Sequence, residues 1–222
     1  YEVVLVSSGA IAVGRNKLNM TSKPDSMRMK QAAAAVGQCS LMYLYDKFFG
    51  DYDKTVAQIL LNAEDIEQEE KKENLINTFN ALLEMGVIPI VNENDSVSYK
   101  EIESEDRLFG DNDMLSAVVA VLCRARHLVI LSDIDGFYDH DPRLYPNAKL
   151  IEQIDTIDDS VYALAGGAGS RRGTGGMRTK LQAAALATSQ GTDTIVTNGK
   201  HPEALYDIVK GLHAGTLFPG KI

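Results

Sequence analysis

The sequence predicts an α/β fold, a three-layer α/β/α sandwich with a mostly parallel central sheet, formed by one domain over residues 1–222. Three observations lead to this prediction. Short apolar runs alternate with longer segments of helical periodicity. Four or five of these runs are apolar throughout, as is typical of strands covered on both faces. No change of composition, internal repeat or low-complexity tract marks a linker.

The first strand is expected at residues 3–6, where the run Val-Val-Leu-Val is continuously apolar. Ser7, Ser8 and Gly9 then turn the chain into a helix that begins at Ala10. Small side chains and a glycine allow the backbone amides of this turn to meet a ligand carboxylate, although a plain connection between a strand and a helix fits equally well. A second helix is expected over residues 27–49, capped by Ser26 and ended by Gly50.

The second strand candidate covers residues 55–61, and Asn62 with Asp65 marks the start of the helix that follows. Residues 64–73 are densely charged with both signs, which favours a solvated helix face over a catalytic pair of carboxylates. The amphipathic pattern continues without a break to Gly86, which is well placed to end the helix.

A third strand is expected at residues 87–91, and Pro89 indicates that its ladder is interrupted or lies near an edge. Polar residues 92–95, Asn-Glu-Asn-Asp, follow at its carboxyl end, which is where open α/β sheets bind ligands. The connection to Asp113 is about twenty residues long, and loops of this length are often lids or binding loops. The helix over 114–123 is then capped by Asp113 or Asn112.

The fourth strand, residues 127–131, is followed by Ser132 and Asp133, so small polar groups again follow a strand. The cluster Asp139-His140-Asp141 is read as a turn in preference to a metal site, because no second ligand cluster accompanies it. Further elements are expected in the remainder of the chain: a short strand at 151–154, a helix at 160–165, a fifth strand at 194–197 and a helix at 202–212.

A glycine-dense turn, residues 173–180 (Gly-Thr-Gly-Gly-Met-Arg-Thr-Lys), leads into an alanine-rich helix. Glycines let backbone amides approach a ligand closely, and the positive end of the helix faces that ligand. Lys180 lies within about the first two turns, close enough to reach an oxygen of a bound phosphate. A mobile linker before a helix fits this stretch alone equally well, and it is not a Walker A sequence. We expect the polar clusters after strands one, three and four to share one edge of the sheet, with the glycine turn closing over it.

Composition restricts the class of function. The 222 residues, 45% of them hydrophobic, suffice for one substantial core. The net charge of −9 and the pI near 4.9 argue against a general nucleic-acid or membrane-surface binder, because either needs a basic face. No apolar run approaches the ~18–20 residues of a membrane span. Cys39 and Cys123 are expected to be two buried free thiols, which favours a reducing cytoplasm.

Taken in order, the motifs at residues 7–14, 91–95, 110–113 and 173–180 resemble those of the amino acid kinase family, with Ser132-Asp133 between the third and the fourth. The match runs almost from end to end. Within the family, the chain resembles the members that phosphorylate the side-chain carboxylate of L-glutamate, in proline biosynthesis.

This resemblance implies roles for particular residues. Those that would bind glutamate are Ser8, Gly9, Ala10, Asp95, Asp111 and Asn112. Those that would contact ATP are Ser132, Asp133, Thr174, Gly175, Gly176, Met177, Arg178, Thr179 and Lys180. Lys180 and Asp113 would be catalytic, with Asp113 orienting the phosphate-binding lysines. Mg²⁺ would be carried mainly by the ATP phosphates, with no metal ligand assigned in the chain. Proline, the feedback inhibitor, would compete at the loop between Asp95 and Asp111, and the protein would form a homo-oligomer.

The chain departs from the family pattern in two places. The family begins with a strand and a Lys-x-Gly turn that nothing before Val3 supplies, so we expect a further βα unit of roughly 25–30 residues upstream. Many members also carry an RNA-binding-like domain at the carboxyl end, which we expect to be absent after Ile222.

Two other functions remain open. One is another small-acid or nucleotide kinase of the same fold, such as an acetylglutamate or uridylate kinase; the other is a non-catalytic nucleotide or amino-acid sensor. The acidic Asp95 and the 111–113 loop suit a substrate with a free ammonium group better than a second phosphate, which requires arginines.

Overall fold

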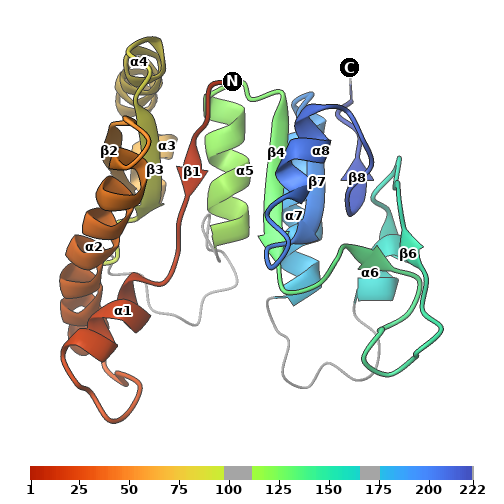
Figure 1. Ribbon diagram of the computed structural model, residues 1–222, viewed down its shortest axis with the longest axis horizontal. Helices are drawn as coiled ribbons and strands as arrows, with labels where there is room; N and C mark the ends of the chain where they lie inside the picture. The colour runs from red at the N-terminus through yellow and green to blue at the C-terminus, as the bar shows by residue number, and fades with distance from the viewer. Residues whose placement is uncertain (98–111, 166–175, 222) are drawn as a thin grey trace. The chain divides into compact units, whose positions relative to one another are not determined.

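The computed structural model describes residues 1–97, 112–165 and 176–221. The chain divides into two compact units, Tyr1–Asn112 and Asp113–Ile222, and each is described by itself (Figure 1). The predicted α/β class with mostly parallel strands is confirmed. The expectation that residues 1–222 form one domain stays a prediction.

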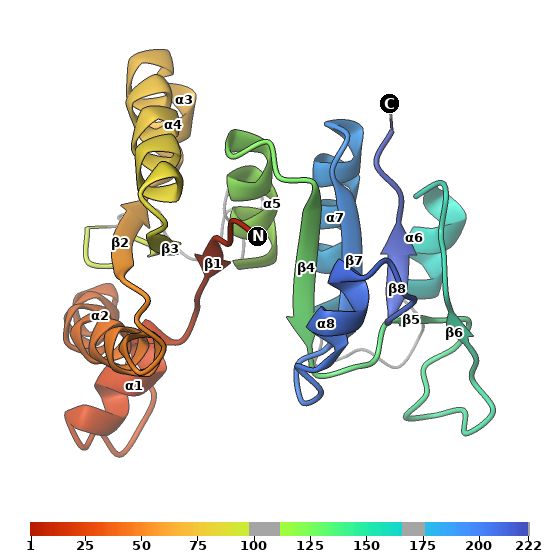
Figure 2. The same cartoon turned by 45° about the horizontal axis from the view of Figure 1, so that its top comes forward.

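The sheet of unit 1 has three parallel strands in the order β1-β3-β2 (Figure 2). They are β1 (Leu5–Val6), β2 (Val56–Leu61) and β3 (Ile88–Glu93). The central strand β3 is the most buried, since Ile90 and Val91 are 1% and 0% exposed. Because β1 and β3 pair in parallel, their carboxyl ends are neighbours, as the sequence predicts for strands one and three.

Pro89 lies within the central strand, so the interpretation of an edge strand is wrong. Ile88 donates its amide hydrogen to Thr55, on the β2 side, while Val91 accepts from Ser7, on the β1 side. Backbone amides of successive residues in a strand point to alternate sides, so the N–H position that Pro89 lacks faces β1. Pairing with β1 starts only at Ile90. The proline therefore removes no hydrogen bond of the ladder.

The helices of unit 1 are α1 (Ala10–Lys17), α2 (Met27–Gly50), α3 (Ala63–Glu67) and α4 (Glu69–Glu84). α1 and α2 approach each other closely at two glycines. A Cβ built on Gly14 would lie 1.8 Å from the carbonyl oxygen of Ala33, and one on Gly37 would lie 1.8 Å from that of Ala10. Only glycine fits at either contact, and this contact holds the start of α1 in place.

The single helix expected between Asn62 and Gly86 is two helices. Gln68 has extended backbone angles, φ −89° and ψ 113°, and it separates α3 from α4. The predicted start is confirmed, because the Asn62 amide donates to Asp65 Oδ2 at 2.8 Å. Gly86 ends α4 with φ 71°, also as predicted. Charge periodicity alone does not reveal the break, since Gln68 suits either conformation.

Unit 2 has a three-stranded sheet in the order β4-β7-β8. Strands β4 (His127–Ser132) and β7 (Asp193–Asn198) are parallel, and β8 (Thr216–Phe218) is antiparallel to β7. A small antiparallel pair, β5 (Phe137–Tyr138) and β6 (Leu150–Ile151), follows β4 along the chain. The sequence does not predict β5 or β8, because two or three residues are too few for a periodic pattern.

The helices that complete the structure are α5 (Asn112–Leu122), α6 (Asp159–Ala165), α7 (Gly176–Ser189) and α8 (Ala204–Val209). α5 and α7 pack in one core with β4, β7 and β8, and Leu181, Ala183, Ala184 and Ala187 of α7 are fully buried there. α8 is shorter than the helix expected at 202–212. The expectation of two buried thiols is wrong for Cys39, which is exposed on α2.

Candidate functional site

The turn after β1 is held by contacts with neighbouring elements. Ser7 donates its amide hydrogen to Val91 at 2.8 Å, and its hydroxyl lies 2.8 Å from that of Tyr45 on α2. Gly9 then adopts φ 92°, a conformation that glycine tolerates best, and α1 begins at Ala10. The amides at the start of α1 are thereby presented at the carboxyl end of the sheet.

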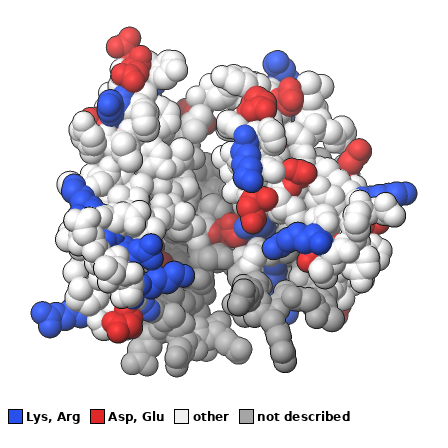
Figure 3. All heavy atoms as spheres, turned by 60° about the horizontal axis from the view of Figure 1, so that its bottom comes forward, with Lys and Arg blue, Asp and Glu red and all other residues white. Residues whose placement is uncertain are grey.

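A cavity of about 410 Å³ opens at this turn. One side of it is formed by the start of α1, at Gly9, Ala10, Ile11 and Ala12. Three basic side chains also line it: Arg15, Lys23 and Lys30. In Figure 3, basic side chains gather over the α1–α2 part of unit 1. The cavity is therefore positively charged on one side, within a chain of net charge −9.

Polar and acidic residues that follow β3 complete the cavity, together with Asn112 at the start of α5. Asn92 is 3% exposed, and its amide donates to Gln38 Oε1 at 2.9 Å. Its own side-chain oxygen accepts the Glu93 amide hydrogen at 2.9 Å. Glu93 and Asp95 are half-buried and bring two carboxylates to the cavity. Opposite charges thus line the same space.

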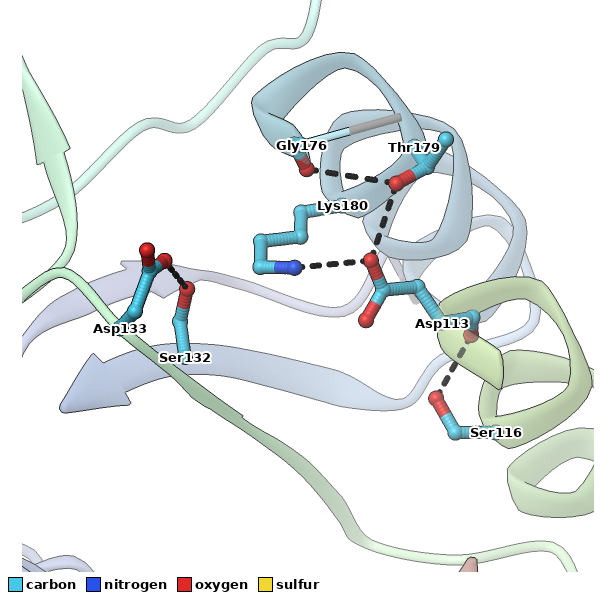
Figure 4. A network of polar contacts seen from close by, with 7 residues as sticks. All are labelled: Asp113, Ser116, Ser132, Asp133, Gly176, Thr179 and Lys180. Carbon is cyan, nitrogen blue, oxygen red and sulfur yellow. Dashed lines mark hydrogen bonds and ion pairs between the residues drawn. The ribbon is translucent and has the colours of Figure 1, made fainter. Parts of the chain in front are cut away.

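A second polar group lies in unit 2, between α5 and α7. Lys180 Nζ donates to Asp113 Oδ2 at 2.8 Å, and the Thr179 hydroxyl donates to the same oxygen at 2.9 Å (Figure 4). The Lys180 and Asp113 side chains are only 14% and 18% exposed. Lys180 lies in the second turn of α7, as the sequence predicts. A positive charge is therefore held in one position near the amino end of a helix.

Ser132 ends β4, and its hydroxyl donates to Asp133 at 3.3 Å. The segment after β4 is tied to β7, because Asn198 donates to Asp135 Oδ1 at 2.7 Å and the Tyr138 hydroxyl donates to Oδ2 at 3.0 Å. The hydrogen bond from Asn198, followed by that from Tyr138, keeps the pKa of Asp135 below its usual value. The ionised Asp135 carboxylate therefore holds the chain in place next to Ser132 and Asp133.

The first three residues of the predicted glycine turn, 173–175, lie outside the described residues, which include the turn from Gly176, the first residue of α7. Met177 packs against the core of unit 2, and the Arg178 guanidinium lies 5.9 Å from the centre of the Tyr162 ring. The side chains of these two residues are thus engaged within unit 2. Thr174 and Gly175, which the resemblance assigns to ATP, are outside the described residues.

The structure brings most residues of the predicted glutamate group together. Gly9, Ala10, Asp95 and Asn112 all line the cavity of unit 1. Ser8 is exposed and is not among the described residues that line it. Asp111 and most of the loop assigned to proline lie outside the described residues.

Sequence reasoning missed the basic residues of the cavity and Glu93. One signal was present: residues 1–30 include Arg15, Lys17, Lys23, Arg28 and Lys30, against only Glu2 and Asp25, in an otherwise acidic chain. The pattern does not tell which of these bases share a cavity, because they lie on α1, on α2 and in the segment that joins them.

Among the described residues, no group of three or more His, Cys, Asp or Glu side chains is arranged to hold a metal ion. The Asp139-His140-Asp141 segment leads into a turn at Asp141, whose carbonyl oxygen accepts the Leu144 amide hydrogen at 3.0 Å. The Asp139 carboxylate accepts the Lys149 amide hydrogen at 2.8 Å, and that of Asp141 accepts the Arg143 amide hydrogen at 2.9 Å. In the part of the chain that the structure describes, no helix is long and apolar enough to cross a membrane.

Comparison with known proteins places the chain. The amino acid kinase family matches residues 1–198. Glutamate 5-kinase of Clostridium perfringens is 56% identical over 220 residues, which cover 99% of this chain and 81% of that protein. Glutamate 5-kinase of Listeria innocua is 49% identical, with coverage of 99% and 79%.

Solved structures of lower identity share the fold. Carbamate kinase from Giardia lamblia, bound to AMP-PNP, is similar with a TM-score of 0.63 and 17% identity, over 99% of this chain and 85% of that one. Isopentenyl phosphate kinase of T. acidophilum has a TM-score of 0.62 and 19% identity, over 97% and 83%. The resemblance of the motifs is thus confirmed by similarity along nearly the whole sequence: the chain belongs to the amino acid kinase family.

Proposed function

We propose that the chain transfers the γ-phosphate of ATP to the side-chain carboxylate of L-glutamate and forms γ-glutamyl phosphate, the first step of proline biosynthesis. The observation that carries this proposal is the identity of 48–56% with glutamate 5-kinases, which extends over 98% or more of the chain. The cavity of unit 1 supports it, because its opposite charges suit an amino acid.

On the phosphate side, Lys180 is the proposed catalytic cation. Asp113 holds the Lys180 ammonium at 2.8 Å, and Thr179 donates to the same carboxylate, so the lysine is positioned before a ligand arrives. Charge neutralisation by a positioned donor needs no rearrangement during the reaction. The amides at the start of α7, with Ser132 and Asp133 at the end of β4, are the proposed contacts of ATP.

On the substrate side, the amides of Gly9 and Ala10 would bind a carboxylate, with Ser8 beside them. Asp95 would accept hydrogen bonds from the substrate ammonium, and Asn112 would add an amide. The reaction is an in-line attack of the glutamate γ-carboxylate oxygen on the γ-phosphorus, with ADP leaving. A carboxylate is already ionised near neutral pH, so no general base is required, and catalysis depends on positioning and on charge neutralisation.

Mg²⁺ is proposed as a companion of ATP. The described residues offer no cluster of carboxylates for a resident metal ion, whereas Mg²⁺ commonly binds through substrate phosphates and keeps several waters. When bound, the ion would neutralise part of the phosphate charge. Competition by proline at the loop after Asp95, homo-oligomer formation and a cytoplasmic location belong to the same proposal, through the resemblance to the family.

The test is incubation with Mg-ATP and L-glutamate in the presence of hydroxylamine, which traps an acyl phosphate as a coloured hydroxamate. We expect a hydroxamate with glutamate and none with N-acetylglutamate. Product from N-acetylglutamate alone would indicate an acetylglutamate kinase instead. ADP formation with UMP alone would indicate a uridylate kinase. Nucleotide binding without any ADP release would indicate a sensor.

A further inference from the structure

The basic side of the unit 1 cavity has no function in the reaction as described above. Arg15 lies in the last turn of α1, Lys30 in the first turn of α2, and Lys23 in the segment between them. Among the described residues none of the three forms a salt bridge, although all three line a cavity that also contains carboxylates. Three cations that line one cavity of an acidic chain and form no salt bridge with a described residue can bind an anionic ligand.

Arg15 adds a second observation. Its side-chain Nε is buried, and within the described part of the chain this atom has no hydrogen-bond partner. A buried donor on a charged group that lacks a partner costs free energy, so such groups are rare in folded proteins unless a ligand or water satisfies them. By contrast, Lys17 in the same turn donates to the Ser40 hydroxyl at 2.9 Å. Arg15 is therefore the basic residue of α1 that is available to a ligand.

The chemistry of the reaction decides which carboxylate of the substrate lies at these cations. The attacking carboxylate must keep its negative charge to act as a nucleophile, and a direct guanidinium or ammonium partner would lower its nucleophilicity. Neutral amides, such as those at Gly9 and Ala10, bind a carboxylate with less loss of nucleophilicity. The cations are thus suited to the carboxylate that does not react.

We propose that Arg15, supported by Lys30 and Lys23, binds the α-carboxylate of the amino-acid substrate, while Asp95 and Glu93 on the acidic side of the cavity face its ammonium. This inference rests on the proposed function. It makes Arg15 a specificity-determining residue: the site selects an α-amino acid whose side chain ends in a second carboxylate. An amine with one carboxylate lacks the group that Arg15 binds.

Two substrate fragments test this assignment. Glutarate keeps both carboxylates and lacks the ammonium, whereas 4-aminobutyrate keeps the ammonium and the reacting carboxylate and lacks the α-carboxylate. Each is used as a competitive inhibitor against L-glutamate, with wild-type protein and with Arg15→Gln. We expect Arg15→Gln to raise the KM for glutamate and the inhibition constant of glutarate by a similar factor, roughly 10- to 100-fold. The inhibition constant of 4-aminobutyrate should change less than about twofold, and kcat at saturating glutamate should be kept.

The matched control is Lys17→Gln, which removes a charge from the same helical turn outside the cavity and should leave all three constants unchanged. Arg15→Lys should recover part of the affinity for glutarate. Equal weakening of all three ligands would overturn the proposal, because it would show that Arg15 only supports the fold. A change confined to the KM for ATP would assign these cations to a phosphate instead, and no change at all would also refute the inference.

A second measurement separates this inference from the proposed function. The thermal stabilisation of the protein by glutarate and by 4-aminobutyrate requires no turnover. If no hydroxamate forms with glutamate, the proposed reaction fails. Loss of stabilisation by glutarate in Arg15→Gln, with that by 4-aminobutyrate kept, still supports the carboxylate site, and equal stabilisation of variant and wild type by glutarate refutes it.

Discussion

Unit 1 and unit 2 have similar scaffolds but differ in the charges of their polar sites. Each has a three-stranded sheet with helices packed on it, and in each the polar residues follow the carboxyl ends of parallel strands. Unit 1 has a cavity with bases on one side and carboxylates on the other. Unit 2 has one lysine fixed by one aspartate at the start of a helix.

This difference suits the two parts of the proposed substrate pair. An amino acid carries charges of both signs, so its site needs partners of both signs. A triphosphate is uniformly negative, and its site needs a positive charge that stays in place as the phosphate is transferred. Loss of function in unit 1 should thus appear mainly in the KM for glutamate, and in unit 2 mainly in kcat.

The largest effect is expected for Lys180→Ala. Removal of the positioned cation should lower kcat by about 100- to 1,000-fold, the range found for single donors that stabilise transition-state charge, while the KM for glutamate changes less than about threefold. Steady-state kinetics with hydroxamate detection measures both constants. The control is Lys210→Ala, at an exposed position after α8. A normal kcat would remove Lys180 from this role and with it the proposed contrast between the units.

Asp95→Asn should give the opposite result. Loss of the carboxylate that faces the ammonium should raise the KM for glutamate by roughly 10- to 100-fold, as expected for a charged hydrogen bond, with kcat nearly unchanged. Asp51→Asn, exposed after α2, is the control. Unaltered affinity for glutamate would contradict the assignment of Asp95.

Gly37→Ala tests whether the packing of α1 on α2 positions the cavity. The added Cβ would lie 1.8 Å from the Ala10 carbonyl oxygen, so the helices must move apart. We expect the free energy of unfolding, measured with urea, to fall by about 1–3 kcal/mol. The KM for glutamate should rise, because α1 carries Ala10 and Arg15. Gly50→Ala, where the new Cβ has no atom within 4 Å, should be neutral or slightly stabilising. Equal stability of the two variants would contradict the close contact.

The smallest effect concerns the two thiols, one in each unit. Burial raises the pKa of Cys123 to about 11, so at pH 8 only about one molecule in a thousand carries its thiolate. Iodoacetamide followed by mass spectrometry should show Cys39 alkylated first, because it is exposed. The rate at Cys123 should rise about tenfold per pH unit between pH 8 and 10, since the thiolate is the nucleophile. Equal rates at pH 8 would show that α5 opens readily.

Much of the fold and part of the site could be predicted from local signals. Apolar runs located four of the longer strands and the amino-terminal strand, because buried strands need side chains that tolerate burial on both faces. The glycine at the end of α4 and the Asn62–Asp65 start were also correct, since caps depend on neighbouring residues only. The break at Gln68 was not found because glutamine suits either conformation, and β5 and β8 were not found because two or three residues are too few for a periodic pattern.

By itself, the sequence determined the α/β class, the family and the polar groups that follow each strand, because these depend on periodicity and on residue type at fixed spacing. Only the tertiary structure decided which charges share a space. It paired Lys180 with Asp113, 67 positions away, and it brought Arg15, Lys23 and Lys30 to the same cavity as Asp95. The physical reason is that charge pairing acts through distance in space, which the spacing of residues along the chain does not encode.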